Sequence, residues 1–175
     1  MRNESTKAAA RHQRQAVDPA QRISGVLCLA LLLTGLSFGC RSVPPLPAVD
    51  LKEPGWTVHQ GQAVWKRGPE MPEIAGEILV ATRPNGRAFV QFSKNPFPLV
   101  IAQRTSNTWQ VETPTDGKRY SGHGTPPARL IFLHLANVLS GSPPPKGWTW
   151  QKANDNGWRL TNPSRGESLE VFFAQ

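Results

Sequence analysis

The side chains that could do chemistry in this 175-residue chain are few, and their spacing matches no common catalytic or metal-binding pattern. The histidines after the first forty residues, His59, His123 and His134, are too far apart in the chain to form a metal signature. Asp116, Ser121 and His123 are close enough in sequence to suggest a hydrolase triad. They fall on a turn and a short strand, however, without the strained turn that exposes a catalytic serine. We therefore predict no catalytic residue, no metal and no cofactor.

The first 39 residues have the composition of an export signal. Residues 1–22 are rich in arginine and lysine, and residues 23–39 form an uncharged, mostly apolar run. This run is shorter than the roughly 20 residues of a comfortable membrane span, and it suits the apolar region of a signal peptide. Of the two cysteines, Cys28 lies inside the run and Cys40 directly follows it. We expect residues 1–39 to be a signal peptide.

Residues 36–40 (Leu-Ser-Phe-Gly-Cys) resemble the lipobox of bacterial lipoproteins. The resemblance implies cleavage between Gly39 and Cys40, with lipid attached to Cys40 as the new N-terminus. Ser37 and Phe38 depart from the residues most common in this motif, while Gly39 fits it. The alternative is a single-pass membrane anchor in which Cys40 has no role. Several acyl chains on one residue hold a protein stably on a membrane, so membrane lipid is the first expected partner.

The distribution of charge argues against nucleic acid as a partner. The whole chain has a net charge of +8, but residues 40–175 contain 15 lysines and arginines against 10 acidic residues, a net charge of +5. These cations are scattered and form no run or stripe that would neutralise a phosphate backbone. A weakly basic surface suits anionic lipid headgroups. Arg41, directly after Cys40, is typical of lipoproteins sent to the outer membrane, so we expect a lipid-anchored protein of the bacterial envelope facing the periplasm.

The rest of the chain divides into a tether and one β-rich domain. Residues 40–54 contain four prolines and predict an extended tether. From residue 55 to residue 175, short β-rich segments alternate with turn sequences, which predicts consecutive antiparallel strands. Residues 95–98 (Asn-Pro-Phe-Pro) are expected to form a loop, because proline lacks the N–H that a sheet requires. Strands are expected at residues 57–65, 73–82, 87–93, 99–104, 108–112, 119–122, 147–152, 158–162 and 167–173.

Residues 128–140 are predicted to form the single substantial helix, with Thr125 as its cap and Pro126 and Pro127 in its first turn. Nearly every position of this segment is apolar. A helix that is apolar all round must be buried on more than one side. We therefore expect a mainly β, α+β fold in which a curved antiparallel sheet wraps a buried helix.

Four segments resemble the bacterial lipoprotein-carrier superfamily, whose members include a periplasmic carrier and an outer-membrane lipoprotein receptor. They are residues 76–100, 109–111, 139–141 and 157–160. The resemblance implies an open half-barrel, a strongly curved and unclosed β-barrel with helices in its mouth and an apolar cavity for acyl chains. It also implies lipoprotein acyl chains or a periplasmic carrier as partners. This domain is shorter than the familiar members and has one substantial helix, so a small cavity is expected.

Apolar residues of the predicted strands and helix are the candidates for lining that cavity, because alkyl chains offer no hydrogen bonds to polar partners. The candidates are Trp65, Leu79, Phe89, Leu99, Trp109, Leu130, Leu133 and Trp158. The alternative is that the tryptophans simply fill a small β core. Phe97, between two prolines, is predicted either to touch the membrane as an exposed tip or to tuck under the sheet.

Two functional hypotheses follow, and neither involves covalent chemistry. In the first, the half-barrel of a membrane-anchored lipoprotein binds or accepts acyl chains, in lipoprotein sorting to the outer membrane. In the second, a structural or interaction lipoprotein of the envelope fills the interior with its own side chains and carries no lipid. The space between the helix and the sheet distinguishes them.

Overall fold

The structure is a computed structural model that describes residues 43–154 and 156–173. The predicted signal peptide, Gly39 and Cys40 lie outside these residues. The described part consists of nine strands, one short 3₁₀ helix and one α-helix. The elements are β1 (Thr57–Lys66), β2 (Glu73–Thr82), β3 (Ala88–Lys94), β4 (Phe97–Arg104), β5 (Thr108–Thr113), η1 (Pro114–Asp116), β6 (Lys118–His123), α2 (Ile131–Leu139), β7 (Thr149–Asn154), β8 (Gly157–Asn162) and β9 (Glu167–Phe173).

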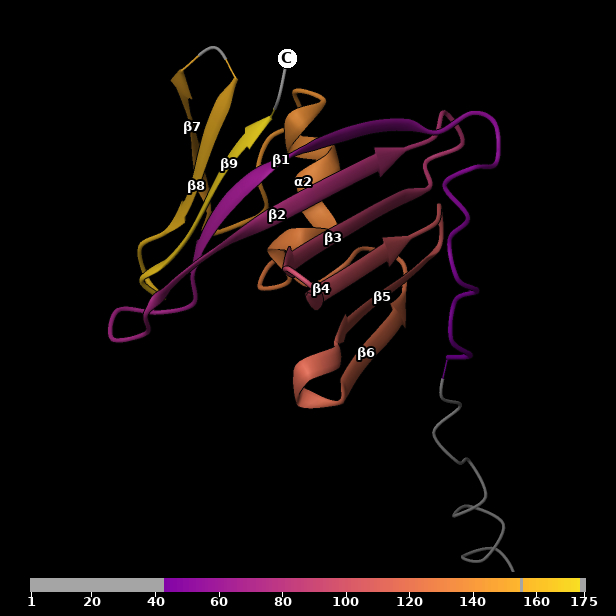
Figure 1. Ribbon diagram of the computed structural model, residues 1–175, viewed down its shortest axis with the longest axis horizontal. Helices are drawn as coiled ribbons and strands as arrows, with labels where there is room; N and C mark the ends of the chain where they lie inside the picture. The colour runs from indigo at the N-terminus through magenta and orange to yellow at the C-terminus, as the bar shows by residue number, and fades with distance from the viewer. Residues whose placement is uncertain (1–42, 155, 174–175) are drawn as a thin grey trace, which may run out of the picture. The chain divides into compact units, whose positions relative to one another are not determined.

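All nine strands belong to one antiparallel sheet with the order β6-β5-β4-β3-β2-β1-β9-β8-β7 (Figure 1). The first six strands form a meander, and the last strand, β9, returns to pair with β1. Strands β6 and β7 are the two edges, so the sheet is not closed into a barrel. The prediction of a mainly β fold with consecutive antiparallel strands and one principal helix is confirmed.

The β3–β4 connection differs from the sequence-based expectation. Only Asn95 and Pro96 form the turn, because β4 already begins at Phe97, and Pro98 pairs with Ser93. The ladder shifts its register between Phe92 and Ser93. Proline is tolerated at the start of a strand and beside a bulge, where no ladder hydrogen bond is lost. The prediction of a loop through residue 98 was therefore wrong.

The helix begins three residues later than expected. Its N-cap position is Leu130, which makes no side-chain capping bond, so the prediction that Thr125 caps the helix was wrong. The preceding residues form a separate turn in which the Leu130 N–H donates to the Pro127 carbonyl over 3.0 Å. His134 Nε2 lies 3.2 Å from the same carbonyl oxygen. Two partners for one carbonyl hold this turn in place ahead of the helix.

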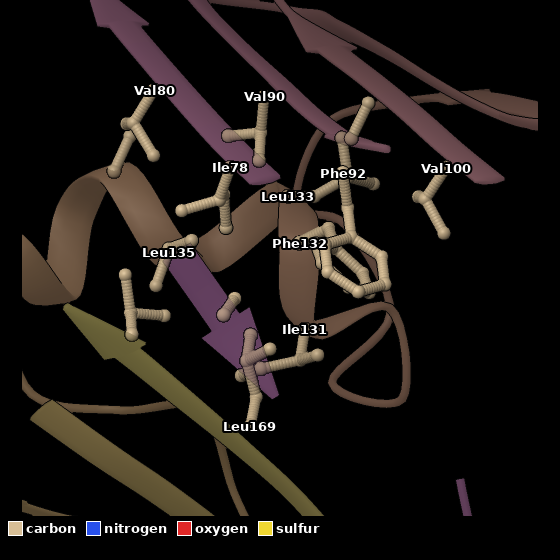
Figure 2. Close-up of a cluster of buried hydrophobic side chains, with 14 of the residues drawn as sticks. Ile78, Val80, Val90, Phe92, Val100, Ile131, Phe132, Leu133, Leu135 and Leu169 are labelled. Carbon is tan, nitrogen blue, oxygen red and sulfur yellow. The ribbon is translucent and has the colours of Figure 1, made fainter. Parts of the chain in front are cut away.

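One face of the sheet, here called the helix side, packs against α2. The helix contacts β2, β3 and β4, and six of its nine residues are buried. Side chains of the helix side alternate with those of the opposite, outer face, as strand geometry requires. Figure 2 shows the resulting cluster, in which Ile78, Val90 and Phe92 point toward Phe132 and Leu135. The same cluster includes Leu160, Leu169 and Val171 from β8 and β9.

The predicted tether contacts the domain. The backbone N–H of Leu46 donates to Oε1 of Gln110 over 2.8 Å, and Gln110 is a buried residue of the outer face. Further along, Arg83 pairs with Glu53 at 2.7 Å, and its guanidinium lies 4.6 Å from the centre of the Trp56 ring. The ion pair and the cation–π contact both fix the position of this arginine side chain. Residues 46–56 are therefore held against the sheet.

Candidate functional site

Five of the eight predicted cavity residues lie on the helix side of the sheet or on the helix itself. Trp65, Trp109 and Trp158 share a strand face with the core residues, since Trp65 pairs with Leu169 and Trp158 with Val171. Leu133 is fully buried in α2, and Leu130 packs against the core from the position before the helix. Of these five, Trp65, Trp109, Leu130 and Leu133 belong to the buried core or pack against it, while Trp158 contacts the ring of Phe173.

Leu79 and Phe89 lie on the outer face instead. Leu79 alternates with Ile78 and Val80, which point to the helix, and Phe89 pairs with Ala81. Successive residues of a strand point to opposite faces. The expectation that Leu79 and Phe89 line one cavity with Trp65 and Leu133 was therefore wrong.

The remaining candidate, Leu99, lies next to the register shift of β4 and packs partly against the core.

Sequence analysis missed the residues at the centre of the interior. They are Ile78, Val80, Val90, Phe92, Val100 and Phe132. The signal for the strand residues is the period-two alternation of β2 and β3, which places Ile78, Val80, Val90 and Phe92 on one face.

Aromatic side chains occupy the space between α2 and the sheet. Phe92 stacks on Phe132 with ring centres 5.9 Å apart. Trp65 packs edge-on against both, at 5.0 Å from Phe132 and 6.1 Å from Phe92. Edge-to-face and offset-stacked arrangements are the favourable geometries of aromatic pairs. The interior bordered by the predicted residues is thus filled by this aromatic cluster.

A pocket of about 320 Å³ opens beside the aromatic cluster and is here called the arginine-lined mouth. Trp65 and Leu130, which both pack against the core, form its apolar floor. The loop after β1, the segment before α2 and the β8–β9 turn contribute one arginine each. The lining residues are Trp65, Arg67, Tyr120, Arg129, Leu130, Arg165 and Glu167.

Glu167 is a buried acid in the wall of the mouth. Its side chain is 5 % exposed, and its carboxylate accepts hydrogen bonds from Trp65 Nε1 at 3.3 Å and Arg165 Nε at 3.2 Å. Burial raises the pKa of Glu167 above its ordinary value of 4.5, while the bonds from Trp65 and Arg165 oppose this rise. Keeping Glu167 charged in the folded protein therefore has a net cost in free energy.

This cost predicts a specific pH dependence of stability. The folded protein binds a proton on Glu167 more tightly than the unfolded chain, so the free energy of unfolding falls as pH rises from 4.5 to the raised pKa. We expect Glu167→Gln to remove this contribution, whose slope cannot exceed about 1.4 kcal/mol per pH unit. Urea unfolding of both proteins between pH 4 and pH 8 measures it. A stability difference that is constant over this range would contradict the prediction.

The residues weighed for a hydrolase are not assembled. Asp116 lies in η1 before β6, and His123 is the last residue of that strand. Five or more strand steps of about 3.3 Å place them roughly 16 Å apart. His134 is half-buried, and burial lowers its pKa. Within residues 43–154 and 156–173, no three His, Cys, Asp or Glu side chains are grouped to hold a metal ion.

Phe97 is the most exposed large apolar side chain that the structure describes. It is 66 % exposed at the tip of the β3–β4 hairpin, so of the two alternatives the exposed tip is correct. Contact of Phe97 with a membrane stays a prediction. In the described ranges, no helix has the length and apolarity needed to cross a membrane.

Comparison with known proteins provides no relative from which a role could be carried over. No family model matches the chain, and no curated protein sequence matches it.

Proposed function

We propose that this protein is a membrane-anchored lipoprotein whose domain accepts acyl chains between α2 and the helix side of the sheet, through the arginine-lined mouth. The observation that carries the proposal is the continuity of apolar surface from the floor of the mouth into the core: Trp65 belongs to both. Apolar walls reward the burial of an alkyl chain by about 0.8 kcal/mol per methylene. Lipoproteins destined for the outer membrane are the proposed source of the chains.

Two glycines support the curved, half-barrel form of the sheet that this proposal includes. A Cβ at Gly61 would lie 2.0 Å from the Phe172 carbonyl oxygen, and one at Gly76 would lie 2.3 Å from that of Ser93. Backbones that approach so closely require residues without a side chain, as occurs where strands bend sharply. The apolar residues all round α2 are also consistent with a sheet that curves about it.

Acceptance of a chain requires α2 to move, because side chains occupy the interior (Figure 2). The segments on either side of the helix are joined by a hydrogen bond from Trp148 Nε1 to the Ala128 carbonyl at 2.9 Å. We propose that α2 and these segments swing away as one unit. The chain then takes the place of Phe132 and its neighbours against the sheet.

The filled interior also favours a second candidate function. Phe92, Leu135, Leu160 and Leu169 are fully buried, as in an ordinary protein core. A structural or interaction lipoprotein of the envelope needs no more than this. Such a protein would use its surface and would carry no lipid inside.

Photo-crosslinking of the full-length protein in its native membrane separates the two functions. Cells expressing the protein receive palmitic acid with a diazirine on the chain, are illuminated, and the labelled peptides are mapped. Labels on β2, β3 and α2, competed by unlabelled palmitate, are expected for an acyl acceptor. Labels confined to the residue 40 anchor and the Phe97 tip would overturn the proposal and support the structural role. Native mass spectrometry of the same preparation reports acylation of Cys40.

A further inference from the structure

We propose that the arginine-lined mouth binds the anionic headgroup of an acyl lipid, a carboxylate or a phosphate, while the chain continues over its apolar floor. This inference rests on the proposed acyl-accepting function and adds fatty acids and phospholipids to its ligands, because the ester- and amide-linked acyl groups of a lipoprotein have no anionic head. An uncharged acyl group would leave the cations of the mouth without a partner.

The first support is the balance of charge in the mouth. Its one acid, Glu167, is already matched by Arg165 at 3.2 Å. Arg83, Arg119 and Arg159 form ion pairs elsewhere. Over the ranges that the structure describes, neither Arg67 nor Arg129 has an acidic side chain within 4.0 Å. The mouth therefore has two positive charges in excess.

The second support is the position of these charges relative to the apolar floor. The Arg67 guanidinium lies 5.5 Å from the centre of the Trp65 ring, and Arg129 directly precedes Leu130, the other floor residue. Guanidinium groups bind carboxylates and phosphates through paired hydrogen bonds. Cations that border apolar surface match a molecule with an anionic head and an alkyl chain.

The third support is the size of the mouth. Its volume of about 320 Å³ is at the lower end of the roughly 300–1,000 Å³ of small-molecule sites. This is room for a headgroup and the beginning of a chain, and the rest of the chain must enter the interior. Tyr120, 44 % exposed on β6, adds a hydroxyl at the rim.

The test compares two probes with alkyl chains of the same length, one with an anionic headgroup and one with an uncharged headgroup. The full-length protein is reconstituted in phosphatidylcholine vesicles that contain either diazirine palmitic acid or diazirine hexadecanol. We expect the acid to label peptides around Trp65 and Leu130 about tenfold more than the alcohol, a difference of about 1.4 kcal/mol in binding. The double variant Arg67→Gln and Arg129→Gln should lose this preference, and the Arg67→Lys and Arg129→Lys variant should retain part of it. Arg159→Gln, at an exposed arginine of β8 outside the mouth, is the matched control and should change nothing.

Inorganic phosphate distinguishes a lipid headgroup from a free anion. Because the chain contributes to binding, millimolar phosphate alone should displace little of the acid probe, whereas complete displacement would overturn the lipid assignment. Equal labelling by acid and alcohol, unchanged in the double glutamine variant, would overturn the headgroup site and leave the acyl-accepting function standing. Absence of labelling by both probes would overturn both.

Discussion

Phe92→Ala is expected to lower the free energy of unfolding by about 3–5 kcal/mol. Phe92 is completely buried on β3 and contacts both Phe132 of α2 and Trp65 of β1. Truncation removes the apolar surface of the ring and leaves a void that the closely packed neighbours on β1 and α2 cannot fill. Urea unfolding followed by tryptophan fluorescence measures the loss.

Phe97→Ala is the matched control, because it makes the same chemical change at an exposed position, the first residue of β4. Phe97 is 66 % exposed, and we expect a change of no more than about 0.5 kcal/mol. Similar losses at Phe92 and Phe97 would show that the core is not where the structure places it.

Gly61→Ala is the second substitution with a large expected effect. The added Cβ would lie 2.0 Å from the carbonyl oxygen of Phe172 and 2.8 Å from Cα of Phe173, so the backbones of β1 and β9 would have to separate. Overpacking in a core costs about 1–3 kcal/mol, and here no flexible side chain can yield. We expect a loss of about 3 kcal/mol or more in the free energy of unfolding.

Gly68→Ala provides the comparison for this prediction. A Cβ at Gly68 would meet Met71 at 3.7 Å and the Arg165 carbonyl oxygen at 3.8 Å, which are ordinary contacts. Its stability should stay within about 1 kcal/mol of the unchanged protein, with the sign set by the lower entropy of the unfolded chain. If Gly61→Ala were as stable as Gly68→Ala, the close approach of β1 and β9 would be excluded.

The β1–β9 pairing that Gly61 permits also places the mouth. Trp65 and Glu167 belong to these two strands, and their hydrogen bond joins residues 102 positions apart in the chain. A loosened β1–β9 pair would therefore disturb the mouth as well as the fold. Variants at Gly61 are informative about stability but unsuitable as tests of ligand binding.

Local sequence patterns were sufficient to predict the number and kind of the main elements of this domain, its strands and its helix. Alternating β-rich segments and turns such as Asn85-Gly86 predicted nine strands, and the apolar segment after Pro127 predicted the helix. Each of these signals depends on neighbours within a few residues. They left open whether Phe97 is an exposed tip or lies under the sheet, and the structure shows the exposed tip.

Tertiary structure decided which of these residues meet. The sequence did not show that Pro98 could join a strand beside a bulge, or that Leu79 and Phe89 would face away from the helix. It also did not show that Arg67, Arg129 and Arg165 would surround one pocket. Periodicity predicts which residues share a face of one strand or helix, but strand register and the packing of distant segments determine what that face contacts. For this reason, only folding brings together the remote residues that form the arginine-lined mouth.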